Sequence, residues 1–217
     1  MNQPANTRDR DRTTRQLIEA VGRVLARDGF ERCGVNAVAR EAGLDKVLIY
    51  RYFSGMPGLL TAYGESATFW PTVDEILGEN RRALSLPLGE RLEAILDTLL
   101  DALRSRPETL AIMAWELVQR NPLTDRLAEV RERWGRELIA QSASDVGAIG
   151  ELGEDGIALT NLVVAGIQYL LLRARTVDDY GGLALNTDEG WQRIRRAIRL
   201  MGRGLELSAR EASDAGR

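Results

Sequence analysis

The sequence predicts an all-α protein of about nine helices. Apolar residues recur at helical spacing along most of the 217 residues, and runs of alternating β-branched residues, which would indicate strands, are missing. Glycine- and proline-containing joints separate the periodic segments. These observations predict a compact N-terminal group of three helices that a fourth helix joins to a larger helical bundle.

The first three predicted helices are short and closely spaced. The first covers about residues 13–28 and is closed by Gly29. The second covers residues 35–42 and ends at Gly43, and the third covers residues 45–53 and opens with an aspartate, which favours helix N-termini. A fourth helix is expected after Pro57, with these residues on one side: Leu60, Tyr63, Ala67 and Trp70. Longer helices are expected at about residues 88–104, 108–119, 123–142, 155–175 and 188–212.

The composition excludes several classes of function. One cysteine, Cys33, and no histidine leave no internal disulfide, no Ser-His-Asp or Cys-His nucleophile and no histidine-bound zinc. No G-x-x-x-x-G-K-S/T phosphate loop occurs. We therefore expect no enzyme, no cofactor and no metal site. Cys33 is expected to be a packing residue, and the acidic pairs Glu154–Asp155 and Asp178–Asp179 are expected to lie in solvated loops.

The N-terminus and the apolar runs predict a cytoplasmic protein with no membrane partner. Residues 1–15 are polar and charged and contain no apolar segment typical of a signal peptide. The longest apolar run, residues 157–172, is interrupted by Asn161 and Gln168. It is also shorter than the roughly 20 residues that a membrane span needs.

The charge is unevenly distributed along the chain. Residues 8–55 contain ten lysines and arginines against seven acidic residues, whereas the remainder contains 19 against 25. Such asymmetry indicates a segment that faces nucleic acid, although a small arginine excess is also typical of an ordinary solvated surface.

Residues 40–53, R-E-A-G-L-D-K-V-L-I-Y-R-Y-F, have the pattern of a helix-turn-helix. On a helical wheel, one arc holds Lys46, Val47, Tyr50 and Arg51, and the opposite arc holds Leu48, Ile49, Tyr52 and Phe53. The first arc suits a DNA groove, because cations neutralise phosphates and Val47 can contact a thymine methyl. An amphipathic surface helix with ordinary charges explains the same spacing about equally well.

A longer pattern is more specific. The segments R-Q-L-I-E-A-V-G-R-V-L-A-R-D-G-F, V-N-A-V-A-R-E-A-G-L-D-K-V-L-I-Y-R-Y-F and G-L-L follow one another over about residues 13–60. They resemble the DNA-binding domain of the tetracycline-repressor-like (TetR) family of transcriptional regulators. The resemblance implies a helix-turn-helix DNA-binding domain at residues 8–55 and a helical ligand-binding and dimerisation domain at residues 56–217. It implies DNA contacts from Thr13, Arg15, Asn36, Lys46, Val47, Leu48, Tyr50, Arg51 and Tyr52.

Three positions depart from the family pattern. Gly34 replaces the usual threonine or serine that caps the second helix, Met56 stands where a phosphate-binding lysine is usual, and Asp45 replaces a frequent serine. These departures would weaken DNA binding, and the arginines that precede the first helix could compensate.

The resemblance also implies an effector pocket and a dimer interface. The pocket residues are expected to be Tyr63, Trp70, Met113, Trp115, Glu116, Gln119 and Trp134, although each aromatic taken singly also fits plain core packing. Asn161 and Gln168 share one face of an apolar helix, where buried amides would need partners. The interface residues of a homodimer are expected to be Asn161, Ala165, Gln168, Leu172, Ile194, Ile198, Met201 and Leu205.

The sequence thus predicts a ligand-responsive, homodimeric DNA-binding regulator. It is expected to be a repressor that a small amphipathic effector releases from a palindromic operator in double-stranded DNA. The alternative is an all-α small-molecule carrier or protein-interaction module whose helix-turn-helix no longer binds DNA, and Gly34 and Met56 are the residues that favour it.

Overall fold

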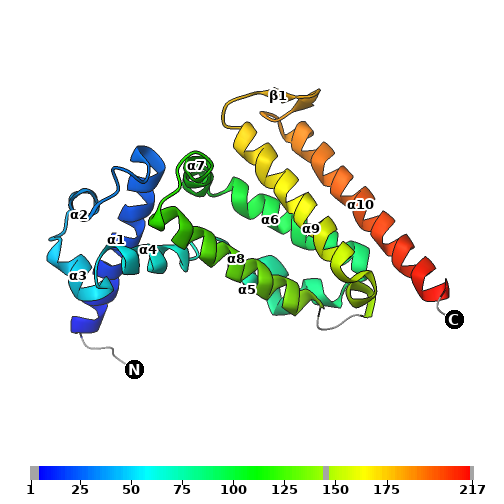
Figure 1. Ribbon diagram of the computed structural model, residues 1–217, viewed down its shortest axis with the longest axis horizontal. Coiled ribbons are helices and arrows are strands. Elements are labelled where there is room, and N and C mark those ends of the chain that lie inside the picture. Colours follow the sequence, from blue (N-terminus) through cyan, green and yellow to red (C-terminus); the bar gives the residue numbers. More distant parts are fainter. Residues whose placement is uncertain (1–4, 144–146, 216–217) are drawn as a thin grey trace. The chain divides into compact units, whose positions relative to one another are not determined.

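The computed structural model describes residues 5–143 and 147–215, which form ten α-helices, one 3-10 helix and a two-stranded hairpin (Figure 1). The chain divides into two compact units, Met1–Trp70 with Arg106–Arg133 and Pro71–Ser105 with Trp134–Arg217. This division differs from the boundary predicted after residue 55, because segments far along the chain pack with the N-terminal helices.

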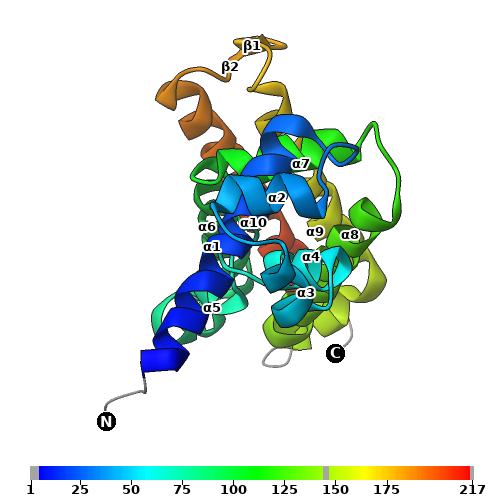
Figure 2. The same ribbon diagram turned by 90° about the vertical axis from the view of Figure 1, so that its left-hand side faces the viewer.

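The first unit is built around α1 (Ala5–Asp28), whose apolar stripe of Leu17, Val21, Val24 and Leu25 is fully buried. Around it pack α2 (Val35–Ala42), α4 (Met56–Gly64) and α7 (Pro107–Glu116), while α3 (Val47–Phe53) packs on α4 (Figure 2). The N-terminal part of α8 (Pro122–Ala143) completes this unit. The bounds of α2 match the prediction from the sequence, and α1 begins earlier than predicted.

Two glycines allow close approaches inside this unit. A Cβ atom on Gly22 of α1 would lie 2.6 Å from the Tyr63 ring of α4, so the two helices cross where α1 has no side chain. A Cβ atom on Gly58 would lie 1.8 Å from the carbonyl oxygen of Phe53. The end of α3 and the start of α4 therefore fit together only because residue 58 is glycine.

Helix α4 ends at Gly64 and does not continue to Trp70 as the sequence predicted. The Ser66 hydroxyl donates to the carbonyl oxygen of Tyr63 at 2.6 Å, and the Ser66 amide donates to the same oxygen at 3.0 Å. These two bonds from Ser66 compete with the backbone hydrogen bonds that would continue the helix, so the helix ends here. Ala67 and Trp70 accordingly lie in the segment after α4.

The second unit has α6 (Leu88–Arg104) packed along α10 (Asp188–Ala215), with α9 (Gly147–Arg173) beside both (Figure 1). At the crossing of α6 and α10, a Cβ atom on Gly89 would lie 2.5 Å from the carbonyl oxygen of Gly202, and one on Gly202 would lie 2.6 Å from that of Gly89. Two short elements precede α6, namely α5 (Val73–Leu77) and the 3-10 helix η1 (Glu79–Ser85). A hairpin of β1 (Asp179–Tyr180) and β2 (Leu183–Ala184) links α9 to α10.

Residues 150–156, expected to form a joint, lie inside α9. A glycine inside a helix costs only about 1 kcal/mol relative to alanine, so the glycines here do not break the helix. The pair Glu154–Asp155 therefore belongs to a helix and not to a loop.

The segment Asp155–Arg173 is long and apolar enough to cross a membrane by length and composition alone. One such helix is weak support for a membrane span. Only 22% of this window is buried inside the chain, so α9 presents an exposed apolar face.

Candidate nucleic-acid interface

The turn between α2 and α3 is built by two residues. Gly43 has φ +65° and closes α2, and the Leu44 amide donates back to the Ala39 carbonyl oxygen at 3.0 Å. The Asp45 carboxylate accepts from the Val47 amide at 2.8 Å, which caps the start of α3 as the sequence predicted. The negative charge of Asp45 thus serves the first turn of α3.

Helix α3 has one buried and one exposed face, as the helical wheel predicted. Ile49 is fully buried, and Leu48, Tyr52 and Phe53 are half-buried. Lys46 and Arg51 are exposed, and the exposed fractions of Val47 and Tyr50 are 51% and 58%. A valine and a tyrosine between two cations on the surface add little to the fold, so this face is available to a partner.

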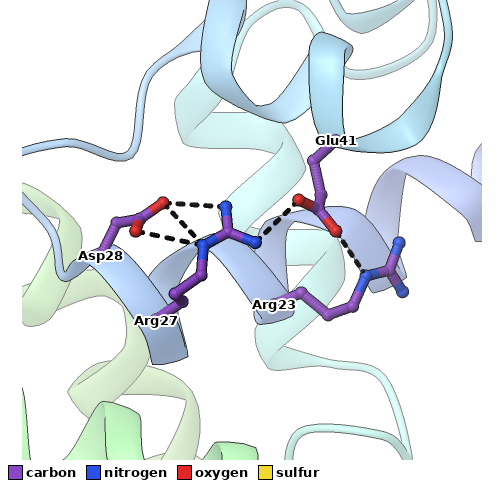
Figure 3. A network of polar contacts seen from close by, with 4 residues as sticks. All are labelled: Arg23, Arg27, Asp28 and Glu41. Carbon is purple, nitrogen blue, oxygen red and sulfur yellow. Dashed lines mark hydrogen bonds and ion pairs between the residues drawn. The ribbon is translucent and has the colours of Figure 1, made fainter.

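A charged network joins α1 to α2 (Figure 3). The Glu41 carboxylate of α2 accepts from Arg23 Nε and from Arg27 Nη1, both at 2.9 Å, and Arg27 Nη2 also donates to Asp28 at 2.9 Å. The hydrogen bonds from Arg23 and Arg27 hold the pKa of Glu41 below its ordinary value. The network fixes the orientation of α2, and it also neutralises two of the arginines of this segment.

The cations of the predicted DNA-binding surface are differently engaged. Within the described part of the chain, Arg15, Lys46 and Arg51 form no ion pair, so their charges are available for phosphates. The Arg10 guanidinium lies 5.4 Å from the centre of the Tyr52 ring, so Tyr52 holds this arginine by a cation–π contact.

The other predicted DNA contacts are spread over α1 and α2. Asn36 is exposed on α2. The Thr13 hydroxyl donates to the Asp9 carbonyl oxygen at 2.8 Å inside α1 and is partly exposed. These contacts remain predictions.

The other two departures from the family pattern, Gly34 and Met56, have simple structural counterparts. Gly34 occupies the N-cap of α2 with φ −125° and ψ 169°, and no side chain caps the helix there. A Cβ atom at Gly34 would meet nothing within 4 Å, so a capping side chain would fit. Met56 is the half-buried first residue of α4 and offers no charge to DNA.

Cys33 is buried, and burial raises the pKa of its thiol to about 12, which makes it a packing residue.

Most of the predicted effector residues belong to the core of the first unit. Tyr63, Trp70 and Met113 are buried, and the Tyr63 ring centre lies 5.0 Å from that of Phe69. Trp115 is partly exposed and lies against Gly29. Trp134 belongs to the second unit.

The polar members of this group, Glu116 and Gln119, are half-buried. Glu116 accepts from both terminal nitrogens of Arg131, at 2.9 and 2.5 Å, and the same guanidinium lies over the rings of Phe69 and Trp70. Burial raises the pKa of Glu116, and Arg131 opposes this shift. The buried Gln119 Oε1 has no hydrogen-bond partner among the described residues. None of the seven predicted effector residues lines the cavity of about 70 Å³ that lies in the second unit between α6, α8, α9 and α10.

The predicted interface residues fall into two groups. Asn161, Ala165 and Met201 are exposed, and Gln168, Leu172 and Leu205 are half-buried. Ile194 and Ile198, by contrast, have exposed fractions of only 7% and 1%, because α10 has a second apolar face that packs on α6. The expectation that these two isoleucines face a partner is therefore corrected. The exposed apolar residues on α9 and α10 also include Leu162, Tyr169, Leu200 and Leu207. The seven-residue spacing of the last two places them on one face of α10, so the sequence could have predicted that they share this face.

Helices α2 and α3 and the turn between them form a helix-turn-helix with an exposed face on α3. Residues 17–63 match the model of the bacterial regulatory proteins of the tetR family. No curated protein matches the chain.

Three solved structures share the fold. The fatty acid degradation regulator FadR from Bacillus halodurans has a TM-score of 0.62 at 17% identity, covering 92% of this chain and 97% of that chain. A TetR-like transcriptional regulator from Rhodococcus sp. RHA1 has a TM-score of 0.58 at 16% identity, with 94% and 98% covered. A TetR family transcription regulator from Marinobacter aquaeolei VT8 has a TM-score of 0.50 at 20% identity, with 88% and 96% covered. The chain thus has the fold of these TetR-family transcriptional regulators.

Proposed function

We propose that the chain is a homodimeric transcriptional repressor that leaves a palindromic operator when a small amphipathic effector binds. The observation that carries the proposal is the exposed face of α3. It presents two unpaired cations, Lys46 and Arg51, beside Val47 and Tyr50, on a helix fixed by its cap and its buried face. Such a face can neutralise phosphates and contact base edges together.

The dimer part of the proposal draws on the exposed apolar face of α9 and α10. A membrane would also cover such a face, but Asn161 lies in the middle of it and exposed arginines, Arg196 and Arg203, lie on α10. A second copy of the same surface covers it at lower cost, because amides can pair across a two-fold axis. Sedimentation should find a dimer at micromolar concentration, and Ala165→Glu should dissociate it. Ala140→Glu, on an exposed face of α8, is the matched control and should leave the dimer intact.

DNA binding is tested with the DNA upstream of the chain's own gene. Affinity should fall steeply with salt, because lysine and arginine contacts release counterions. Arg51→Ala should lower the slope of log K against log salt by about one unit. Arg82→Ala removes an exposed arginine of η1 in the second unit and should leave the slope unchanged. Equal slopes in all three proteins would remove Arg51 from the phosphate contacts.

The repressor would respond to its effector by a population shift. An effector that binds better to a conformation with wrongly spaced recognition helices lowers the affinity for the operator. The rival function, a carrier or interaction module without DNA binding, is favoured by the uncapped Gly34 and by Met56. Absence of any sequence-specific DNA complex would favour that rival.

A further inference from the structure

The cavity of the second unit has an apolar wall in which two polar residues are almost fully buried. Its volume is about 70 Å³, and its lining includes these aliphatic side chains: Leu88, Leu92, Ile95, Leu138, Ile139 and Leu205. The polar residues are Arg91 of α6 and Ser142 of α8, whose exposed fractions are 4% and 7%.

Arg91 is a buried cation without a carboxylate partner among the described side chains. Its guanidinium donates only to carbonyl oxygens: Nη1 to Ser142 at 3.0 Å, Nη2 to Leu84 at 2.6 Å and to Leu86 at 3.1 Å, and Nε to Leu86 at 3.3 Å. Among the described residues, no carboxylate lines the cavity, and Glu93 of α6 and Glu206 of α10 pair with other arginines, Glu93 with Arg199 at 2.7 Å and Glu206 with Arg210 at 2.5 Å. A guanidinium has five N–H donors, so one hydrogen on Nη1 is left over, and no described side chain neutralises the positive charge.

Ser142 supplies a second and independent unsatisfied group. Its hydroxyl is buried and has no hydrogen-bond partner among the described residues, whereas its carbonyl oxygen accepts from Arg91. Buried hydroxyls are nearly always hydrogen-bonded, so this one, in a cavity wall, can donate to a bound ligand. Thr160, which also lines the cavity, bonds its hydroxyl to the Gly156 carbonyl oxygen and offers no further donor.

We infer that this cavity binds the carboxylate end of an amphipathic carboxylic acid, with Arg91 and Ser142 holding the head group and the aliphatic wall holding the chain. One spare N–H and one O–H match the two oxygens of a carboxylate, and its single negative charge balances Arg91. A phosphate group would bring more charge and more acceptors than these two donors satisfy. The assignment names the effector class, and its regulatory meaning rests on the proposed function.

The size of the cavity restricts the acid further. A protein cavity of about 150 Å³ admits benzene, so a cavity of about half that volume encloses only the carboxylate and the first carbons of an acid, and a longer chain must displace the aliphatic side chains. Hexanoate and hexan-1-ol are therefore suitable probes, because they share a chain and differ in the head group. The competing occupant is ordered water. If the cavity holds only water, hexanoate and hexan-1-ol should show no difference in affinity.

The test measures binding of both probes to the full-length protein by isothermal titration calorimetry. Hexanoate should bind at least tenfold more tightly than hexan-1-ol, and Ser142→Ala should weaken hexanoate binding by about tenfold, the loss expected for one hydrogen bond to a charged group. Because the Ser142 hydroxyl bonds to no described residue, this variant should keep its thermal stability and the backbone contact to Arg91. Ser208→Ala, an exposed serine of α10, should leave hexanoate binding unchanged.

The outcomes separate the cavity from the proposed function. Failure of hexanoate to bind, equal affinities for the two probes, or unchanged hexanoate affinity in Ser142→Ala would overturn the assignment and leave DNA binding untouched. Hexanoate binding that requires Ser142 but does not alter affinity for the upstream DNA would uphold the assignment and refute the effector response.

Discussion

The contact between Gly58 and the end of α3 allows a test in which a single methyl group should displace the recognition helix. In Gly58→Ala the new Cβ atom would lie 1.8 Å from the Phe53 carbonyl oxygen. Close carbon–oxygen contacts are about 3.3 Å, so the two helix ends must separate by roughly 1.5 Å. Overpacking of this kind costs about 1–3 kcal/mol, which outweighs the gain of up to about 1 kcal/mol from replacing a helical glycine by alanine. The substitution should therefore destabilise the protein and weaken DNA binding.

The matched control is Gly135→Ala in α8, where a Cβ atom would meet nothing within 4 Å. Without a clash, the same substitution should stabilise the protein by about 0.5–1 kcal/mol and leave DNA binding unchanged. Thermal unfolding and fluorescence anisotropy with the upstream DNA measure both effects in each variant. The reasoning is refuted if Gly58→Ala stabilises the protein as Gly135→Ala does, or if it leaves the affinity for DNA intact.

Three further predictions follow from particular contacts. Gly34→Ser should supply the missing cap of α2 and raise the free energy of unfolding by a few tenths of a kcal/mol, and a lower midpoint in chemical denaturation would contradict this. The pKa of Glu41 is lower in the folded state than its ordinary value of 4.5. The ionised Glu41 carboxylate therefore stabilises the fold fully above pH 4.5, and this stabilisation is lost as the pH falls through the pKa of the folded state. Glu41→Gln should consequently lose less stability on acidification than the wild type in melts over a pH series, and parallel curves would remove Glu41 from acid unfolding. Gly202→Ala should destabilise the second unit by about 1–3 kcal/mol in thermal melts, since its Cβ atom would lie 2.6 Å from the Gly89 carbonyl oxygen; an unchanged melting temperature would show that α6 and α10 can separate freely.

Local signals predicted the helix-turn-helix well. Gly43 and Asp45 fix the end of α2 and the start of α3 through bonds to neighbouring backbone, so their residue types alone indicate the turn. The alternation of buried and exposed residues on α3 also follows from helical periodicity.

The errors arose where a local side-chain hydrogen bond or tertiary packing overrides the apolar spacing. The sequence predicted that α4 would continue to Trp70, but the Ser66 hydroxyl ends it. Ile194 and Ile198 have the same spacing as an interface stripe, and only the position of α6 shows that they are core residues. Arg91 has the appearance of an ordinary surface arginine in sequence, and its burial beside Ser142 depends on segments about 50 residues apart.

The most direct test of the proposed function is selection of bound fragments from random-sequence DNA by the full-length protein. A dimer that uses the exposed face of α3 should enrich a palindromic sequence whose half-sites lie about one helical turn, or a multiple of it, apart. Val47→Ala should change the preferred bases within each half-site, since Val47 is placed to contact base edges. Recovery of no enriched sequence, or of an enriched sequence that lacks two-fold symmetry, would contradict a homodimeric repressor that reads DNA through α3.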